Sequence, residues 1–255
     1  MFNIFNYCLY AAIGVFIILD TFAPARRFHT VPMWRLRGAL SAVLYFAIAS
    51  YAPYIWADWL GQYQLIDASG LPLWASIPIG LLVAQFIQYW WHRALHSSDT
   101  MWRVFHQMHH SAERMDIWGA LWFHPMDALG FTFAASFALT IPLGIDPLAG
   151  GIVAVLAGVA DVFTHANLKT PRWLGWFIHR PESHGLHHQR GRHTGNFGVL
   201  TIWDQIFGTY ENPKEWNGEA GFYDGSSARV AEMLVFRDVS EPKRPAKRRS
   251  RVAAE

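Results

Sequence analysis

The stretch PLWASIPIGLLVAQFIQYWW at residues 72–91 is followed without a break by HRALH at 92–96. An apolar run of about 20 residues has the length that an α-helix needs to cross the hydrocarbon core of a bilayer. Ionisable residues at the end of a membrane span are usually functional, and the histidines directly after this stretch occupy such a position. This stretch predicts a membrane-spanning helix with a functional site at one end.

The composition of the whole chain agrees with a lipid environment. Hydrophobic residues make up 52% of the 255 residues and charged residues only 16%, whereas an average soluble domain carries about 25% charged residues. The 13 tryptophans suit a protein with aromatic belts at the membrane interfaces. The net charge of +2 gives no field that would attract nucleic acid. The single cysteine excludes an internal disulfide and a metal site with several thiolates.

Three further segments predict membrane helices. Residues 4–20 and 38–57 are apolar runs near spanning length. Residues 126–164 form a longer run that is interrupted around Pro142, Gly144 and Pro147, which predicts a helical hairpin with short arms. These arms either cross the bilayer or dip in and return. The predicted fold class is all-α, an integral membrane helical bundle with a cytosolic, histidine-rich helical cap.

The loop charges orient these spans. Four arginines lie between residues 26 and 37, whereas the loop between the second and third spans carries two aspartates and no Lys or Arg. The positive-inside rule places the first loop in the cytoplasm, so the third span ends at the cytoplasmic face. We expect residues 92–125 and 165–213 to form the cytosolic metal-site region within a single catalytic domain, 1–239. We expect residues 240–255 to form a basic, disordered tail.

Three histidine motifs gather in the predicted cap. HRALH at 92–96 has two histidines, and HQMHH at 106–110 and HGLHH at 184–188 have three each. Positions i, i+3 and i+4 share one helix face, so each motif is expected to present its imidazoles in one direction. Eight imidazoles exceed the three or four ligands of one zinc site and suit two metal ions. The predicted ligands are His92, His96, His106, His109, His110, His184, His187 and His188.

Further candidates flank these motifs. His165 follows the hairpin and is a ninth predicted ligand. Asp161, one helical turn before His165, is either another ligand or a hydrogen-bond partner of the imidazole. A ligand role and a structural role both remain open for His124, His179, His193, Asn196 and Asp204. No catalytic residue beyond the metal ligands is predicted, and the Glu-x-x-His pairs of soluble di-iron bundles do not occur in the sequence.

The motifs resemble those of the fatty acid hydroxylase and sterol desaturase superfamily of membrane enzymes. FHP at 123–125, THAN at 164–167 and NFGVLTIWDQIFGTY at 196–210 are similar to segments of that family, so the resemblance covers roughly residues 80–213. It implies two iron ions without haem and molecular oxygen as co-substrate. It also implies a lipid substrate and an external electron-transfer protein. Hydroxylation and desaturation of a lipid C–H bond are both compatible with the resemblance.

The residues alone also allow a metal-dependent membrane hydrolase, which would use a metal-bound hydroxide. A metal transporter is a weaker alternative. A transporter usually places ionisable ligands near the bilayer midplane, whereas these motifs follow the ends of predicted spans. Trp118, Trp122 and Phe123 are candidates to line a lateral route for the lipid, or to serve as interface anchors or core residues.

Overall fold

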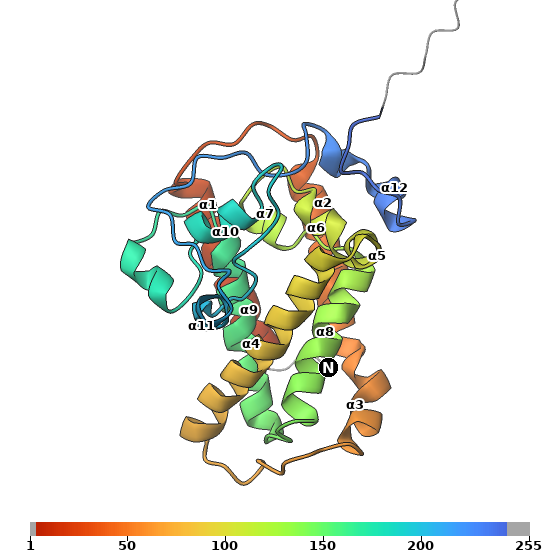
Figure 1. The fold of residues 1–255 in the computed structure, drawn as a ribbon, viewed down its shortest axis with the longest axis vertical. Helices are drawn as coiled ribbons and strands as arrows, with labels where there is room; N and C mark the ends of the chain where they lie inside the picture. Colours follow the sequence, from red (N-terminus) through yellow and green to blue (C-terminus); the bar gives the residue numbers. More distant parts are fainter. Residues whose placement is uncertain (1–3, 244–255) are drawn as a thin grey trace, which may run out of the picture.

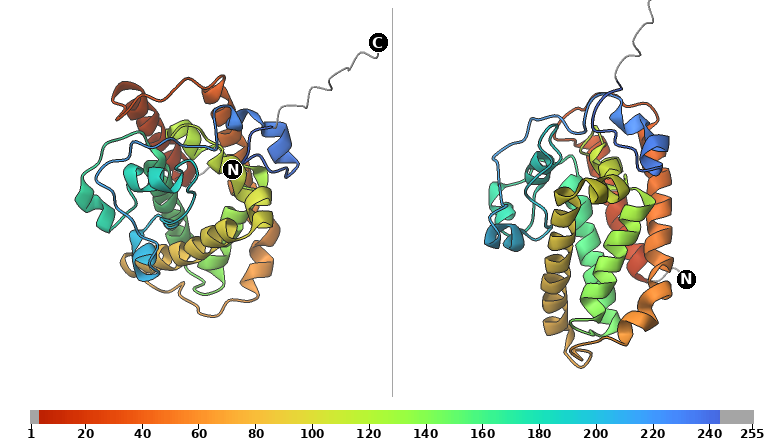
Figure 2. Two further views of the ribbon diagram at one scale, coloured as in Figure 1. Left: turned by 45° about the horizontal axis from the view of Figure 1, so that its top comes forward. Right: turned by 45° about the vertical axis from the view of Figure 1, so that its right-hand side comes forward.

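The computed structural model describes residues 4–243, which form helices joined by loops and, within that range, no strand beyond two isolated β-bridges. Five long helices run side by side along the long axis of the molecule (Figure 1; Figure 2). They are α1 (Ile4–Phe22), α2 (Trp34–Tyr51), α4 (Leu73–Ser97), α8 (Pro125–Thr140) and α9 (Pro147–His165). The predicted all-α fold class is confirmed. Most of the predicted tail, residues 244–255, lies outside the described residues.

Four helical stretches are long and apolar enough to cross a membrane: Ile4–Phe22, Trp34–Gly61, Leu73–Ser97 and Pro147–His165. The second stretch is divided at Pro53, where α2 gives way to α3 (Pro53–Gly61), because proline has no backbone N–H to continue the helix. The third stretch continues to Ser97, past the predicted end at Trp91. The first histidine motif therefore lies on the spanning helix itself.

The hairpin consists of α8 and α9. Gly144 adopts a left-handed backbone with φ 52° in the turn, and the Asp146 side chain accepts the amide hydrogens of Leu148 and Ala149 at the start of α9. With 16 residues, α8 is about 24 Å long, which is less than the hydrocarbon core of roughly 30 Å. The 19-residue α9 is one of the four candidate spans. Both arms pack against α4, and this packing brings the end of α4 close to the ends of the hairpin.

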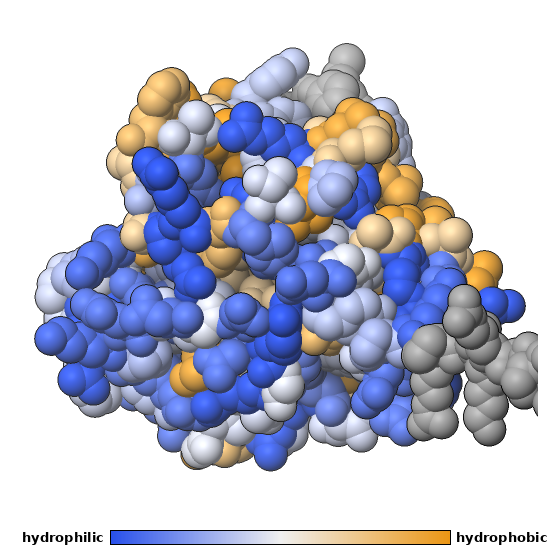
Figure 3. All heavy atoms as spheres, turned by 90° about the horizontal axis from the view of Figure 1, so that it is seen from above, coloured by the Kyte–Doolittle hydropathy of each residue, from blue (hydrophilic) through white to orange (hydrophobic). Residues whose placement is uncertain are grey.

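The cap covers one end of the bundle (Figure 1). Its elements are α5 (Asp99–Met101), the π-helical η1 (Trp102–His106), α6 (Gln107–His110), α7 (Ile117–Ala120), η2 (Arg172–Trp176), α10 (Pro181–His187), α11 (Thr201–Ile206), η3 (Ser226–Ala228) and α12 (Val230–Leu234). Seen from above, this end is mostly hydrophilic (Figure 3). Large apolar side chains such as Val15, Val43 and Trp74 are exposed on the bundle. The contrast fits a bundle in lipid and a cap in water.

An apolar core joins the cap to the bundle. Trp34 of α2, Met108 of α6, Trp122 and Met233 of α12 are buried together in it. The Trp122 ring nitrogen donates a hydrogen bond to the Ser111 hydroxyl at 3.1 Å, so its polar atom is satisfied in the core. This core holds α6, which carries the end of the second histidine motif, against α2.

Candidate metal centre

The nine predicted ligands lie in two groups with converging ring nitrogens. Within each group, one nitrogen from every histidine lies within 4.8 Å of the others. Eight of the nine side chains are buried, and His96 is partly buried. The first group contains His92, His96, His106, His110 and His187, and the second contains His109, His165, His184 and His188.

Helical spacing explains how the motifs divide between the groups. Histidines four residues apart stand one above the other on a helix, and three such pairs each serve one group: His92 with His96, His106 with His110, and His184 with His188. The i+3 histidine of each five-residue motif, His109 or His187, joins the other group. The i+3 and i+4 positions lie about 100° apart around the helix axis. The expectation that each motif points in a single direction is therefore wrong, because each H-x-x-H-H motif serves both groups.

The distances between ring nitrogens fit shared metal ions. In the first group, His92 Nε2 lies 2.9 Å from His106 Nε2. In the second group, His165 Nε2 lies 3.0 Å from the Nε2 atoms of both His109 and His184. Two nitrogens that bind one metal at about 2.1 Å and at right angles are about 3.0 Å apart. The rings are thus spaced as ligands of a common ion would be.

Several ring nitrogens are buried without a hydrogen-bond partner among residues 4–243. They include Nε2 of His110 and His187 and both nitrogens of His188. Burial, reinforced by the neighbouring imidazoles, lowers the pKa of His187 and of His188 well below the usual histidine value. The rings are therefore neutral near pH 7, which is the form that binds a metal. Since an unpaired buried polar atom is costly, this donor set fits two metal ions.

The far nitrogens of two rings are fixed by backbone carbonyls. The His92 Nδ1–H donates to the Phe197 carbonyl at 2.6 Å, and the His187 Nδ1–H donates to the Gly195 carbonyl at 2.6 Å. Because a carbonyl only accepts hydrogen bonds, each contact assigns the proton to Nδ1. The Nε2 lone pair of each ring is then free for a metal.

Asp127 was missed by the sequence reasoning. Its carboxylate accepts a hydrogen bond from His106 Nδ1 at 2.8 Å, and both side chains are buried. A carboxylate in this position orients a ligating imidazole and makes it a stronger donor to the metal. An acidic residue in the first turn of an otherwise apolar hairpin arm was the signal that could have identified it.

The structure places His124 and Asp161 outside both groups. His124 caps α8, where its Nδ1 accepts the amide hydrogen of Met126 at 3.0 Å. The backbone carbonyl of Asp161, rather than its carboxylate, accepts a hydrogen bond from His165 Nδ1 at 2.9 Å. Asp161 thus orients His165 through the backbone and leaves its side chain for another role.

Asp204 and His179 hold the loop that carries Phe197. The buried Asp204 carboxylate accepts hydrogen bonds from the amides of Phe197 at 2.8 Å and Gly198 at 2.7 Å, and from His179 Nε2 at 3.1 Å. Because the Phe197 carbonyl fixes His92, this network positions a predicted ligand without belonging to either histidine group.

Asn196 and His193 also support the rings. Both have a left-handed backbone, with φ 51° and 47° respectively. The Asn196 side-chain amide donates to the Ser183 carbonyl at 2.9 Å, directly before the third motif. His193 Nδ1 lies 3.0 Å from His110 Nδ1. Neither residue belongs to the two histidine groups.

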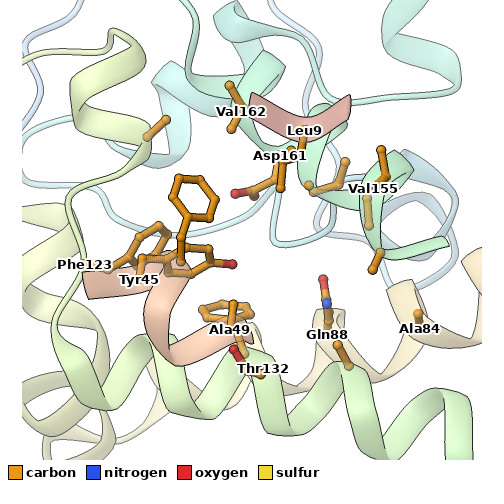
Figure 4. Close-up of a pocket in the computed structure, with 18 of the residues that line it drawn as sticks. Leu9, Tyr45, Ala49, Ala84, Gln88, Phe123, Thr132, Val155, Asp161 and Val162 are labelled. Atoms are coloured by element: carbon orange, nitrogen blue, oxygen red, sulfur yellow. The ribbon is translucent and has the colours of Figure 1, made fainter. Parts of the chain in front are cut away.

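A cavity of about 390 Å³ extends from the rings into the bundle. His92, His106, His109, His165 and His184 line it together with residues of α1, α2, α4, α8 and α9. The side chains of these helices surround an open interior (Figure 4). On α9, Gly151 and Gly158 line the cavity and let the Phe5 and Leu9 side chains of α1 pack closely against the helix.

The residues that line the cavity show which of Trp118, Trp122 and Phe123 fit the predicted lipid route. Phe123 lines the cavity. Trp122 belongs to the core beneath the cap, and Trp118 packs against that core. Neither tryptophan is part of the cavity wall, so only Phe123 fits the predicted route.

Comparison with known proteins identifies the family. Residues 77–209 match the family model described as fatty acid hydroxylase, which is just over half of the chain. The chain therefore belongs to the fatty acid hydroxylase family. The resemblance of its histidine motifs to this family is confirmed.

Curated relatives cover much of the chain. The ornithine lipid hydroxylase of Rhizobium tropici is 30% identical over 173 residues, 64% of this chain and 47% of that protein. The sphingolipid C4-hydroxylase of Schizosaccharomyces pombe is 33% identical over 132 residues, 50% of this chain and 45% of that protein. Human alkylglycerol monooxygenase is 31% identical over 182 residues, 64% of this chain and 35% of that protein. This chain thus spans about half the length of these relatives or less, and no solved structure matches it.

Proposed function

We propose that this protein is a multi-pass membrane enzyme that hydroxylates or desaturates a lipid with molecular oxygen, using two iron ions held by the nine histidines. One observation carries the proposal: the cavity that begins at the histidine rings continues between helices apolar enough to span a bilayer. An aliphatic chain that enters there would place one of its carbons beside the metals. Membership of the fatty acid hydroxylase family supports this reaction class.

The two groups would each hold one ion, with five imidazoles in the first and four in the second. Imidazole nitrogens suit iron, and positions left open on an ion can accept oxygen. The bound ions would supply the activation of dioxygen. Hydroxylation of a C–H bond also consumes two electrons and two protons, because one oxygen atom leaves as water. We therefore include an external electron-transfer protein in the proposal.

The aromatic residues around the rings would exclude water and position the substrate. The Phe123 ring stacks on His109 with 4.4 Å between centroids, and the Phe197 ring lies 5.6 Å from that of His92. Both phenylalanines also line the cavity. Excluding water protects reactive steps from side reactions and strengthens the interactions within the site.

We place the metal centre at the cytoplasmic face. Two arginines of the basic segment 26–37 hydrogen-bond to the cap: Arg26 to the Gly218 carbonyl at 2.8 Å and Arg37 to the Ser227 carbonyl at 2.9 Å. The basic segment and the metal centre therefore lie at the same end of the bundle. The positive-inside rule assigns that end to the cytoplasm.

The test is oxygen-isotope incorporation by the purified protein. The protein is reconstituted in lipid nanodiscs with iron(II), a reduced ferredoxin and a total lipid extract under ¹⁸O₂. We expect an ¹⁸O-labelled or newly unsaturated lipid, which His187→Ala abolishes and His29→Ala, outside both groups, preserves. Lipid cleavage under argon with label from H₂¹⁸O would instead indicate a hydrolase and refute the proposal.

A further inference from the structure

Two short elements of the cap, η2 and α11, carry an exposed apolar surface. Five large apolar side chains on these elements, or directly after η2, are exposed to the surroundings of the protein. They are Trp173, Trp176, Phe177, Ile202 and Ile206, and we call them the apolar patch. The three aromatic side chains are 61–68% exposed. Apolar side chains that gather in this way mark an interaction surface.

The patch belongs to elements that lie beside the bundle rather than on top of the cap. Figure 1 shows α11 at the side of the bundle, lower than α10. Here α11 packs against the spanning helix α4: the Trp203 ring lies 4.8 Å from that of Phe86, and the Phe207 ring lies 4.9 Å from that of Trp90. These contacts fix the depth of α11 relative to α4.

That depth lies within the reach of a bilayer. At 1.5 Å per residue, Phe86 and Trp90 lie about 20 Å and 26 Å along α4 from its start at Leu73. The hydrocarbon core is about 30 Å thick, so a bilayer whose far boundary is at Leu73 also surrounds the contacts of α11. Leu82 and Trp90 are exposed on α4, and the lipid-facing surface of this helix therefore continues toward the patch.

The charges around the patch are arranged as they are at a membrane interface. Residues 173–178 include no charged residue, and Asp204, the charged residue of α11, is buried. Exposed basic residues stand at the border. Arg172 directly precedes the patch and donates a hydrogen bond to the Asn212 carbonyl, two residues before Lys214. Aromatic rings at the acyl boundary with Lys and Arg next to them are typical of protein segments at lipid headgroups.

Hydrogen bonds join η2 and α11 into one unit. The Thr201 hydroxyl and the Gln205 amide both donate to the Trp176 carbonyl, at 2.9 Å and 3.1 Å. The same α11 carries Asp204, whose carboxylate holds the loop that fixes His92. The patch and the support of a predicted metal ligand are therefore parts of one structural unit.

We propose that η2 and α11 are embedded in the membrane interface on the cap side, with the apolar patch among the acyl chains and the bordering basic side chains at the headgroup phosphates. The occupant of the patch is lipid, rather than a second copy of the chain or a soluble partner, because the patch continues the lipid-facing surface of α4 at the same depth. An element of this kind lies in the plane of the interface. It anchors the loop that positions His92 at a fixed depth in the bilayer.

The depth of spin labels tests the proposal. Nitroxides are attached to zinc-loaded, otherwise cysteine-free protein, with one chain per nanodisc, at Phe177→Cys or Ile206→Cys. Trp74→Cys, on the exposed surface of α4, is the lipid reference, and Asp224→Cys, on the cap, is the water reference. Oxygen concentrates among acyl chains, whereas a nickel chelate stays in water. We expect the ratio of oxygen to nickel collision rates at 177 and 206 to exceed that at 224 several-fold and to approach that at 74.

Two results would overturn the proposal. A collision ratio at 177 and 206 equal to that at 224 would show that the patch lies in water. Slow collision with both reagents would show that protein covers the patch. Neither measurement requires turnover, so a chain that oxidises no lipid would refute the proposed function and leave the membrane contact standing.

A charged substitution tests the anchoring of the loop. Phe177→Glu should lower the collision ratio at 206 and release one zinc ion to a chelator several-fold faster than the parent, because the unit that supports His92 is no longer held at its depth. Ile55→Glu, an equally exposed apolar position on α3, is the matched control and should release zinc like the parent. A lower collision ratio at 206 with unchanged zinc release would overturn the anchoring of the loop.

Discussion

Removing the Asp127 carboxylate should weaken the binding of one metal ion and spare the other. Asp127 is the acceptor for His106 Nδ1, and His106 belongs to the five-histidine group. Without this acceptor the His106 imidazole can rotate or place its proton on Nε2. In either case its Nε2 lone pair is no longer available to the metal. Loss of such a supporting contact typically costs 10–100-fold in metal affinity, which is about 1.4–2.7 kcal/mol.

Two substitutions separate the hydrogen bond from the charge. Asp127→Ala removes both and should show the full loss. Asp127→Asn keeps an oxygen that accepts the His106 hydrogen, so we expect a loss of about 10-fold or less, because a neutral acceptor binds more weakly than a charged one. Asp58→Ala, on α3, serves as a control for loss of an acidic residue outside the site.

The assay is a stepwise titration of the metal-loaded protein with a chelator, followed by metal analysis after each step. The parent should release its two ions over one range of chelator concentration, whereas Asp127→Ala should release one ion much earlier than the other. Simultaneous release of both ions, or a curve identical to that of the parent, would refute the reasoning. The melting temperature of the metal-free protein should be compared in parallel, so that unfolding is not mistaken for weaker binding.

Three further predictions follow from the site and the membrane arrangement. His187→Ala should leave about one metal ion per chain by elemental analysis, and His29→Ala about two, because His187 belongs to the five-histidine group and His29 to neither of the two histidine groups. In a cysteine-free background, Lys169→Cys should react with an impermeant thiol reagent from the cytoplasmic side, and Gln62→Cys should react from the opposite side. Reaction of both cysteines from the same side would contradict the topology. Ala135→Phe, in the cavity wall, should lower lipid turnover at least about 10-fold with both metals retained, and unchanged turnover would show that the substrate binds elsewhere.

The sequence was sufficient to predict the long apolar helices and the histidines that converge at one end of them, because both follow local rules. Spans are recognised from the length of apolar runs, and helical spacing brings His92 close to His96 without any knowledge of the fold. The division of the nine histidines into two groups was not predictable in the same way. It depends on the angle at which η1, α6 and α10 meet α4, and this angle is set by tertiary packing. The π-helical turn of η1, which ends at His106, is part of that packing and has no periodic signal.

Residues whose role arises from long-range contacts were missed for the same reason. Asp127 and His106 are 21 positions apart in the sequence and meet only because α8 folds back along α4. Gln85 and Gln88 were equally hard to interpret, since a polar residue in an apolar run can face a neighbouring helix, a lipid or a cavity. Their three-residue spacing shows that they share a face, but only the fold shows that Gln88 faces a cavity that ends at the histidines.

The segment that follows the third histidine motif gains a physical explanation from the fold. Its resemblance to the family was visible in the sequence, yet it contributes no member of either metal-binding group. The Gly195 carbonyl fixes His187 on α10, the Phe197 carbonyl fixes His92 on α4, and Asp204 holds the Phe197 amide. One loop therefore sets the tautomers of two predicted ligands on helices that are far apart in the sequence. Because carbonyls perform this task, the loop depends on its backbone path more than on most of its side chains, and the buried Asp204 and Asn196 side chains hold that path.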